Sequence, residues 1–235
     1  MAHPVQTRWI DLPQAGSAYL AVPPAGHGPG LLLLQEIFGV NEHIRAVADS
    51  FALDGFTVLV PDVFWRQAPR VELGYVGEER QRGIALASAL QPAEVAADLG
   101  VAIATLRGLP EVAGGKLGAI GYCMGGRLAF QAAALGGLDA AVAYYGGGIQ
   151  GQLALAAQIN VPMQFHYAEH DDHIPLTAVQ AVREAMAAHA QAPADVLVYP
   201  GSTHGFNCWA RASYHAGSAA LARGRSLAFL AQHLF

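Results

Sequence analysis

One cysteine lies in a short run of small residues that is typical of an exposed nucleophile. The run Gly121–Gly126 reads G-Y-C-M-G-G and directly follows the mostly apolar segment 116–120. This spacing is the G-x-S-x-G pattern of a nucleophile elbow, with sulfur in place of the serine oxygen. The glycines remove side chains that would clash in a sharp turn from strand to helix. The pattern predicts that Cys123 is a nucleophile at a helix N-terminus, where backbone N–H groups favour a thiolate.

A buried, unreactive cysteine is the alternative interpretation, because free cysteines are among the most often buried residues. The residues that follow two later apolar segments favour the catalytic interpretation. The run Glu169–His173 follows the segment 162–167, and His204 lies in a glycine-rich turn after the segment 195–199. A nucleophile, an acid and a histidine thus come in the chain order of the α/β-hydrolase triad.

These candidate residues need strands whose C-terminal ends meet at one edge of an open sheet. Apolar runs predict strands at Gly30–Leu34, Phe56–Val60, Lys116–Gly121, Ala140–Tyr145, Pro162–Tyr167 and Asp195–Tyr199. Helical patterns lie between them, at Asn41–Leu53, Pro92–Arg107, Cys123–Leu135, Leu176–His189 and Ser213–His233. This alternation predicts an α/β fold with a mostly parallel central sheet and helices on both faces.

Two parts of the chain depart from this alternation. Thr7–Leu12 and Ser17–Val22 are expected to form an antiparallel pair at one edge of the sheet. Arg66–Ala89 is the most irregular stretch, and we expect it to be a loop or a lid over the site. The whole chain, residues 1–235, is expected to form a single domain.

The composition restricts the classes of partner. The 235 residues are 53% hydrophobic and 13% charged, with a net charge of −5 and no basic stripe, so nucleic acid is not an expected partner. The chain start lacks the pattern of a signal peptide, and runs such as 31–34 are too short to span a bilayer. With only two cysteines, which need not pair, we expect a cytoplasmic protein that does not bind membranes. Its oligomeric state stays open.

Five segments together resemble one known family. They are Gln35–Asn41, Val60–Asp62, Gly121–Gly126, Tyr144–Gly146 and His204–Phe206. These segments are similar to those of the dienelactone hydrolases, also called carboxymethylenebutenolidases. The resemblance runs over nearly the whole chain. It implies an α/β-hydrolase fold and the hydrolysis of a small-molecule ester or lactone through an acyl-cysteine intermediate, without a metal or organic cofactor.

The resemblance also implies roles for single residues. Cys123 would be the nucleophile, and His204 its base and later the general acid–base that activates water. Asp171 would orient His204, because the family pattern places its acid four residues before a proline, here Pro175. Asp172 is the alternative acid. The acidic and histidine-rich run around them is not expected to bind metal, because adjacent residues rarely converge on one ion.

Three further groups would complete the catalytic machinery. In the family, the carboxylate of Glu36 lies near the thiol and takes part in its activation; a solvent-facing loop glutamate is the alternative. The oxyanion hole is expected from the backbone N–H groups of Ile37 and Met124. Met124 is the residue after the nucleophile, and Ile37 lies in the loop after an early strand.

Substrate recognition follows the family pattern only in part. Arg82 matches a position at which the family binds a substrate carboxylate, by charge-assisted contacts. At the position of a second family arginine, shortly after the catalytic histidine, this chain has Cys208. Arg211 lies close by in sequence and is a possible substitute. The expected function is therefore dienelactone-type hydrolysis, with two alternatives: a broader carboxylesterase or thioesterase for neutral esters, and a non-catalytic small-molecule binder.

Aromatic residues near the candidate site are expected to line the substrate pocket. These residues are Phe38, Tyr144 and Phe206. Packing in the core is the alternative for each of them. For Trp65, core packing is the favoured interpretation.

Overall fold

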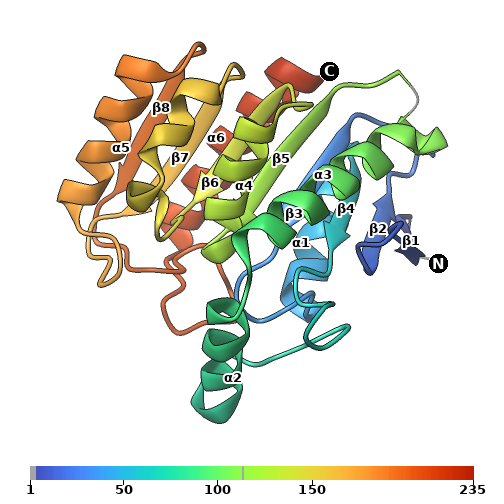
Figure 1. Cartoon of the computed structure of the whole chain (residues 1–235), viewed down its shortest axis with the longest axis horizontal. Helices are drawn as coiled ribbons and strands as arrows, with labels where there is room; N and C mark the ends of the chain where they lie inside the picture. Colours follow the sequence, from blue (N-terminus) through green and yellow to red (C-terminus); the bar gives the residue numbers. More distant parts are fainter. Residues whose placement is uncertain (1–3, 113) are drawn as a thin grey trace. The chain divides into compact units, whose positions relative to one another are not determined.

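The computed structural model describes residues 4–112 and 114–235, and the chain divides into two compact units. Unit 1 is Met1–Gly118 and unit 2 is Ala119–Phe235. The boundary lies within one strand, β5 (Leu117–Tyr122), which Figure 1 shows near the middle of the colour range. The expectation of a single domain over the whole chain stays a prediction.

The described strands of unit 1 form a mixed sheet in the order β1-β2-β4-β3. These strands are β1 (Gln6–Asp11), β2 (Ser17–Val22), β3 (Gly30–Leu34) and β4 (Thr57–Pro61). β3 and β4 are parallel, with Leu31 opposite Val58, and all their residues are buried, as expected for strands covered on both faces. β1 pairs antiparallel with β2, which confirms the predicted edge pair with a shift of one residue in its first strand.

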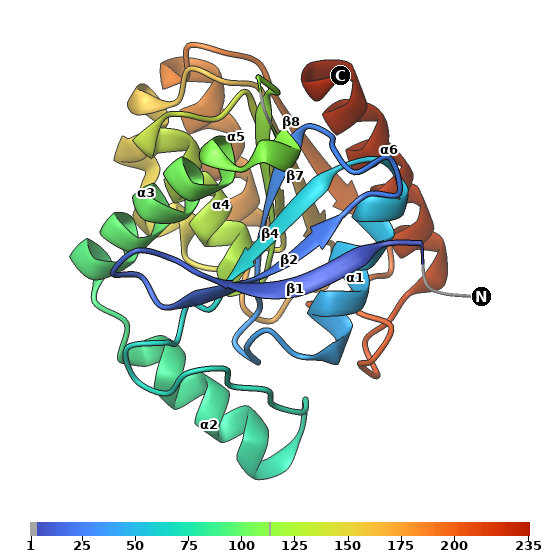
Figure 2. The same ribbon diagram turned by 90° about the vertical axis from the view of Figure 1, so that its right-hand side faces the viewer.

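Two helices cover opposite faces of the unit 1 sheet, α1 (Glu42–Leu53) and α3 (Pro92–Gly108), as Figure 2 shows. α1 begins after Asn41, because the Asn41 side chain accepts a hydrogen bond from the N–H of Ile44 at 3.2 Å. α3 begins at a proline, whose fixed φ suits the first turn of a helix. Both predicted helices are confirmed to within one residue at each end.

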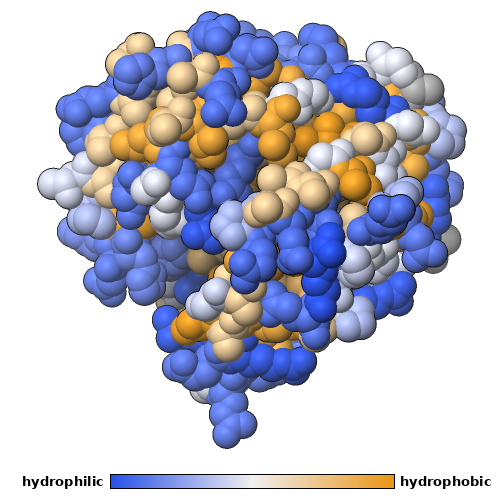
Figure 3. Space-filling view, in the orientation of Figure 1, coloured by the Kyte–Doolittle hydropathy of each residue, from blue (hydrophilic) through white to orange (hydrophobic). Residues whose placement is uncertain are grey.

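The stretch 66–89, expected as an irregular loop or lid, contains the helix α2 (Gly77–Ser88). The expectation of a loop is wrong for residues 77–88, and a lid stays a prediction. Gly83 is the only buried residue of α2, so no apolar period marks this helix in the sequence. α2 lies beyond the end of the sheet of its unit (Figures 1 and 2). Its lower end is mostly hydrophilic in Figure 3.

One pair of helices has the length and composition of a broken membrane span. Taken together, α2 and α3 are long and apolar enough for such a span, with a bend of 93° between them. No single helix in the described parts of the chain is long and apolar enough to cross a bilayer by itself.

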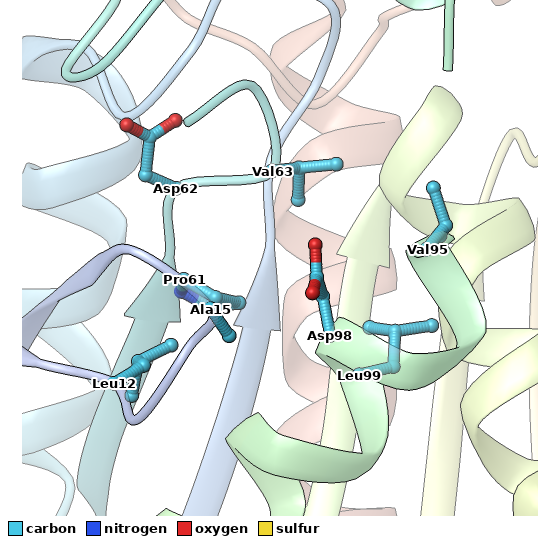
Figure 4. Close-up of a pocket in the computed structure, with 8 residues that line it drawn as sticks. All are labelled: Leu12, Ala15, Pro61, Asp62, Val63, Val95, Asp98 and Leu99. Carbon is cyan, nitrogen blue, oxygen red and sulfur yellow. The ribbon is translucent and has the colours of Figure 1, made fainter. Parts of the chain in front are cut away.

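A small hollow lies in unit 1 beside the end of β4 (Figure 4). Its lining consists of Leu12, Ala15, Pro61, Asp62, Val63, Val95, Asp98 and Leu99. The Asp98 carboxylate accepts hydrogen bonds from Trp65 Nε1 at 2.9 Å and from the Arg66 guanidinium at 2.7 Å. Trp65 also packs closely against Gly16. Both the carboxylate and the indole are therefore engaged in contacts within unit 1.

The described strands of unit 2 follow the order β5-β6-β7-β8, and those after β5 pair in parallel. They are β6 (Ala140–Tyr144), β7 (Met163–Ala168) and β8 (Ala194–Tyr199). Every residue of β5, β6 and β7 is buried. The strand predictions hold to within one residue, because long apolar runs are the clearest signal in this sequence.

Helices cover both faces of the unit 2 sheet (Figures 1 and 2). α4 (Met124–Leu135) and α5 (Leu176–His189) lie on one face, and α6 (Ala216–Leu234) lies on the other. α6 begins three residues later than predicted, because the His215 ring caps it by accepting from the N–H of Ser218 at 3.3 Å.

His166 on β7 is the centre of a buried hydrogen-bond network between the sheet and α6. Its Nδ1 lies 2.7 Å from the hydroxyl of Tyr199, and its Nε2 lies 2.9 Å from both Gln164 Oε1 and Ser226 Oγ. Ser226 is in turn bonded to the Tyr144 hydroxyl at 2.8 Å. Burial lowers the pKa of His166 to about 3, so the ring is neutral in the folded protein at neutral pH.

We predict that His166 makes the protein less stable in acid. Between pH 6.5 and about 3 the unfolded chain binds a proton that the folded chain does not, so the free energy of unfolding falls by about 1.4 kcal/mol for each unit of decreasing pH. Urea unfolding followed by circular dichroism at several pH values measures this slope. The slope should be shallower in His166→Gln. It should be unchanged in the control His189→Gln, which removes an exposed imidazole. Equal slopes in the wild type and both variants would contradict the prediction.

Candidate active site

Cys123 lies at the turn between β5 and α4 with its backbone in a conformation that is unusual for a non-glycine residue. Its φ is 56° and its ψ is −118°. Such a conformation costs of order 1–3 kcal/mol and persists only where surrounding contacts hold it. The N–H of Cys123 donates to the carbonyl of Tyr144 at 3.0 Å, and the carbonyl of Cys123 accepts from Gly126 at 3.0 Å. These bonds tie the turn to the end of β6 and to the start of α4.

The glycines around Cys123 are required by close backbone approaches. A Cβ atom at Gly121 would lie 1.9 Å from the carbonyl oxygen of Gly125, and one at Gly126 would lie 2.5 Å from the carbonyl oxygen of Tyr144. A Cβ atom at Gly146 would lie 3.0 Å from the N–H nitrogen of Arg127. The start of α4 therefore packs against the ends of β5 and β6 at a distance that side chains would prevent.

The structure brings Cys123, His204 and Asp171 together in unit 2. His204 Nε2 lies 3.1 Å from Cys123 Sγ, and His204 Nδ1 donates to Asp171 Oδ2 at 2.8 Å. Cys123 itself is partly exposed. Both nitrogens of one imidazole are thus engaged, one by the thiol and one by the carboxylate, which is the geometry of a nucleophile, base and orienting acid.

Asp171, and not Asp172, is the acid that meets His204. The side chain of Asp171 is fully buried, and its second oxygen accepts from the backbone N–H groups of His173 at 2.8 Å and Ile174 at 3.2 Å. Asp172 is exposed. Within the described residues, no three His, Cys, Asp or Glu side chains are grouped to hold a metal ion.

The surroundings of His204 favour its charged form. Burial by itself disfavours the imidazolium, but the hydrogen bonds and charges of Asp171 and Cys123 outweigh it and raise the pKa of His204 to about 10. His204 is therefore an imidazolium at neutral pH. A positive charge 3.1 Å from Sγ stabilises a thiolate at Cys123.

Met124 is the first residue of α4 and directly follows the thiol. The first N–H groups of a helix have no acceptor within that helix, and the helix dipole makes this end electropositive. The backbone of Met124 therefore lies where such a donor is expected, and its role in an oxyanion hole stays a prediction.

Three further predicted site residues lie in unit 1, in the loop after β3: Glu36, Ile37 and the predicted pocket residue Phe38. Glu36 is 1% exposed, Phe38 is 2% exposed and Ile37 is partly exposed. The loop is fixed by the hydrogen bond from Leu73 N–H to the Phe38 carbonyl at 2.9 Å. At Gly39, with φ of 80°, a Cβ would lie 1.8 Å from a carbonyl oxygen. The roles of Glu36 and Ile37 beside the thiol stay predictions.

Arg82 also belongs to unit 1, where it is an exposed residue of α2. Its neighbour Gly83 allows α2 to approach the loop after β3, because a Cβ there would lie 2.5 Å from the Ile37 carbonyl oxygen. An exposed guanidinium is available to an anionic ligand. Its proposed contact with substrate stays a prediction.

The predicted pocket residues of unit 2 are all buried. The Tyr144 ring stacks on His166 at 4.3 Å between centroids, which favours core packing for Tyr144. Phe206 is fully buried and packs against Tyr145 at 5.4 Å. Cys208 is also fully buried, so no polar group of its side chain reaches the surface.

Two residues that contact His204 were not singled out from the sequence. Tyr145 lies 5.1 Å from His204 between ring centroids, and His173 lies 5.2 Å from it at an interplanar angle of 87°. Tyr145 directly follows β6, and residues at the carboxyl ends of parallel strands are candidates for a site. That position could have indicated Tyr145 from the sequence. His173 is two residues from Asp171, and that adjacency was its only signal.

Comparisons with known proteins show a family and a fold for this chain. Residues 17–234 match the model of the dienelactone hydrolase family. A putative carboxymethylenebutenolidase of Azospirillum brasilense is 38% identical to this chain, over 93% of this chain and 94% of its own length. A carboxymethylenebutenolidase of Pseudomonas putida is 35% identical, over 91% of this chain and 90% of its own length. The crystal structure of a putative dienelactone hydrolase from Klebsiella pneumoniae has a TM-score of 0.84 at 32% identity, covering 97% of this chain and 99% of that one. The predicted α/β-hydrolase fold is confirmed.

We predict that Gly126→Ala lowers the free energy of unfolding by about 2 kcal/mol, the usual cost of overpacking. The new methyl group would lie 2.5 Å from a carbonyl oxygen and would displace the start of α4. Gly224→Ala in α6 is the matched control, because a Cβ there meets no atom within 4 Å. That variant should gain up to about 1 kcal/mol from helix propensity. Urea unfolding measures both, and equal stabilities would contradict the steric explanation of the elbow.

Proposed function

The chain belongs to the dienelactone hydrolase family and is an ester hydrolase of that type, and we propose that it cleaves carboxylic esters or lactones through an acyl-cysteine intermediate. The observation that carries this proposal is the chain of contacts from Asp171 through His204 to Cys123, at the N-terminus of α4. Each of these residues acts in both halves of the reaction.

In the first half, the Cys123 thiolate attacks the acyl carbon of the substrate. The carbonyl oxygen gains negative charge, which the N–H of Met124 stabilises, together with the N–H of Ile37 as the second expected donor. The C–O bond to the leaving group then breaks, and that oxygen takes the proton from His204 Nε2. Asp171 keeps the ring oriented throughout, because it holds Nδ1 at 2.8 Å.

In the second half, water hydrolyses the thioester. Neutral His204 takes a proton from water, and the resulting hydroxide attacks the acyl carbon. The C–S bond breaks and the thiolate returns to its place beside the imidazolium. With a lactone, the leaving oxygen stays attached to the acyl group, so a single hydroxy acid is released. Glu36 would assist the activation of the thiol.

A second candidate function is the hydrolysis of neutral esters or thioesters. It is favoured by Cys208, a fully buried neutral residue at the position where the family has an arginine. Arg82 is then the only family arginine left for an anionic substrate. Rates on dienelactone and on short p-nitrophenyl esters separate the two functions, because exclusive turnover of neutral esters would eliminate the first.

We predict that Cys123→Ala lowers kcat/KM on the order of 10⁴-fold or more, since it removes the nucleophile. Cys123→Ser should recover little of this loss, because a hydroxyl is a far weaker acid than a thiol. Iodoacetamide should modify the wild-type protein once, at Cys123, because Cys208 is fully buried. Mass spectrometry of digested protein locates the modification. Initial alkylation of Cys208, or wild-type rates in Cys123→Ala, would contradict the assignment.

We predict that the pH dependence above neutrality depends on the leaving group. As the pH rises through about 10, His204 loses the proton that an alkoxide leaving group needs, so kcat/KM for alkyl esters should fall about tenfold per pH unit. p-Nitrophenyl esters should fall less, because that leaving group departs without a proton. Circular dichroism checks that the protein stays folded at each pH.

Asp171→Asn provides the variant for this pH experiment. The substitution removes a charge that raises the pKa of His204, so the fall in rate should begin at a lower pH than in the wild type. Asp172→Asn removes an exposed neighbouring charge and serves as the matched control. The same pH of inflection in wild type and Asp171→Asn would contradict the role given to Asp171.

A further inference from the structure

A buried group of polar side chains in unit 2 has no part in the proposed reaction, although it lies at the same strand ends as the candidate site. Its centre is the ring of His166, which is bonded to Tyr199, Gln164 and Ser226. Tyr199 is the last residue of β8, and Tyr144, which is bonded to Ser226, is the last residue of β6. Ser226 comes from α6, on the face of the sheet that this helix covers (Figure 2). All of these side chains are buried.

The partners of His166 determine which of its ring nitrogens carries the proton. Gln164 Oε1 only accepts hydrogen bonds, so the N–H must be on His166 Nε2, which lies 2.9 Å from that oxygen and 2.9 Å from Ser226 Oγ. A neutral imidazole has one N–H, so Nδ1 accepts from the Tyr199 hydroxyl at 2.7 Å. Arg225 Nη1 in turn donates to that hydroxyl at 3.3 Å. One tautomer therefore satisfies every member and fixes the orientation of each.

A single peptide group, between Tyr144 and Tyr145, joins this network to the nucleophile. Its carbonyl accepts from the N–H of Cys123 at 3.0 Å, and its N–H donates to the carbonyl of His166 at 2.7 Å. Because a peptide group is planar, the two bonds fix one rigid unit between the backbones of Cys123 and His166. Tyr145 has a φ of 35°, a conformation that persists in a non-glycine residue only where surrounding contacts hold it.

The side chain of Tyr144 ties the same peptide group to the ring of His166. The two rings stack at 4.3 Å between centroids, with an interplanar angle of 22°. The Tyr144 hydroxyl lies 2.8 Å from Ser226 Oγ, which is also a partner of His166 Nε2. Without the His166 ring, Tyr144 would lose its stacking partner, and the peptide group that holds the strained turn at Cys123 would lose its support.

The network supports the imidazole of His204 by a second route. The ring of Tyr199 packs against Phe206 at 5.1 Å between centroids, and Phe206 packs against Tyr145 at 5.4 Å. Tyr145 in turn lies 5.1 Å from the ring of His204. Both the thiol and the imidazole of the candidate site are therefore connected to the ring of His166.

We propose that His166 is a positioning residue, which holds Cys123 Sγ and His204 Nε2 at their separation of 3.1 Å. It acts through the peptide group after Tyr144 and through the ring of Tyr199. The inference rests on the proposed function, because acyl transfer needs the thiol and the imidazole in one fixed geometry. A misplacement of reacting groups by about 1 Å costs on the order of 100-fold in rate.

The test removes single hydroxyl groups and leaves the shapes of the side chains nearly unchanged. Ser226→Ala breaks the link to Tyr144, and Tyr199→Phe removes the donor to His166 Nδ1. We expect each variant to lower kcat/KM for p-nitrophenyl acetate about fivefold, with the change mainly in kcat. His166→Leu breaks both routes and should lose about 100-fold. His166→Gln keeps an N–H donor and should retain more activity than His166→Leu.

A second measurement reports on the thiol without any ester. The rate constant for alkylation of Cys123 by iodoacetamide at pH 7 should fall in the same variants, because the thiolate depends on the imidazolium 3.1 Å away. The matched control is Leu234→Ala, which removes a buried side chain of α6 about two turns beyond Ser226. The control should unfold at a lower urea concentration but keep both rate constants. Circular dichroism checks that each variant is folded in the assay.

The outcomes separate the inference from the proposed function. Wild-type rates of hydrolysis and alkylation in folded Ser226→Ala and Tyr199→Phe would overturn the inference. Equal losses in Leu234→Ala would overturn it as well, since they would show a general effect of lower stability. A wild-type protein that does not hydrolyse p-nitrophenyl acetate, and that iodoacetamide does not modify at Cys123, would overturn the proposed function and the inference with it.

Discussion

The left-handed backbone at Cys123 is the constraint on which the candidate site depends. It places the thiol at the N-terminus of α4, but it is stable only because the N–H of Cys123 is bonded to the Tyr144 carbonyl and because α4 can approach β5 and β6 closely. Glycines at 121 and 126 permit that approach, since a Cβ at either position would lie within 2.5 Å of a carbonyl oxygen. Strain at one residue is thus offset by backbone contacts around it.

His204 is the charged group of the candidate site. Its imidazole lies between a buried carboxylate and the thiol, and their combined effect raises the pKa of His204 to about 10 in spite of burial. His166 lies on the same sheet in the opposite electrostatic situation: neutral hydroxyl and amide partners leave burial uncompensated, and the pKa falls to about 3. A fully buried histidine and a largely buried one therefore differ in charge at neutral pH because only the second, His204, has anionic partners.

The strands were predictable because they are apolar runs bounded by turns, and β3 and α5 match their predictions at both ends. α2 was missed because only Gly83 in it is buried, so neither an apolar period nor a side-chain cap marks it. Aromatic residues near the site were the hardest to interpret. Tyr144 lies at the end of an apolar strand, as a pocket residue would. Its hydroxyl, however, is hydrogen-bonded to Ser226, which is 82 residues away in the chain.

By itself the sequence determined the fold class and the family resemblance and predicted a nucleophile, because apolar periods and the G-x-C-x-G-G turn are local patterns. From the residues alone, Asp171 and Asp172 were equivalent neighbours, and only the family spacing favoured the first. The tertiary structure decided between them, and it brought His204 to a cysteine 81 residues away. It also placed His173 against that ring. Such contacts join separate strand ends, and their geometry depends on packing and on backbone hydrogen bonds that no short stretch of sequence specifies.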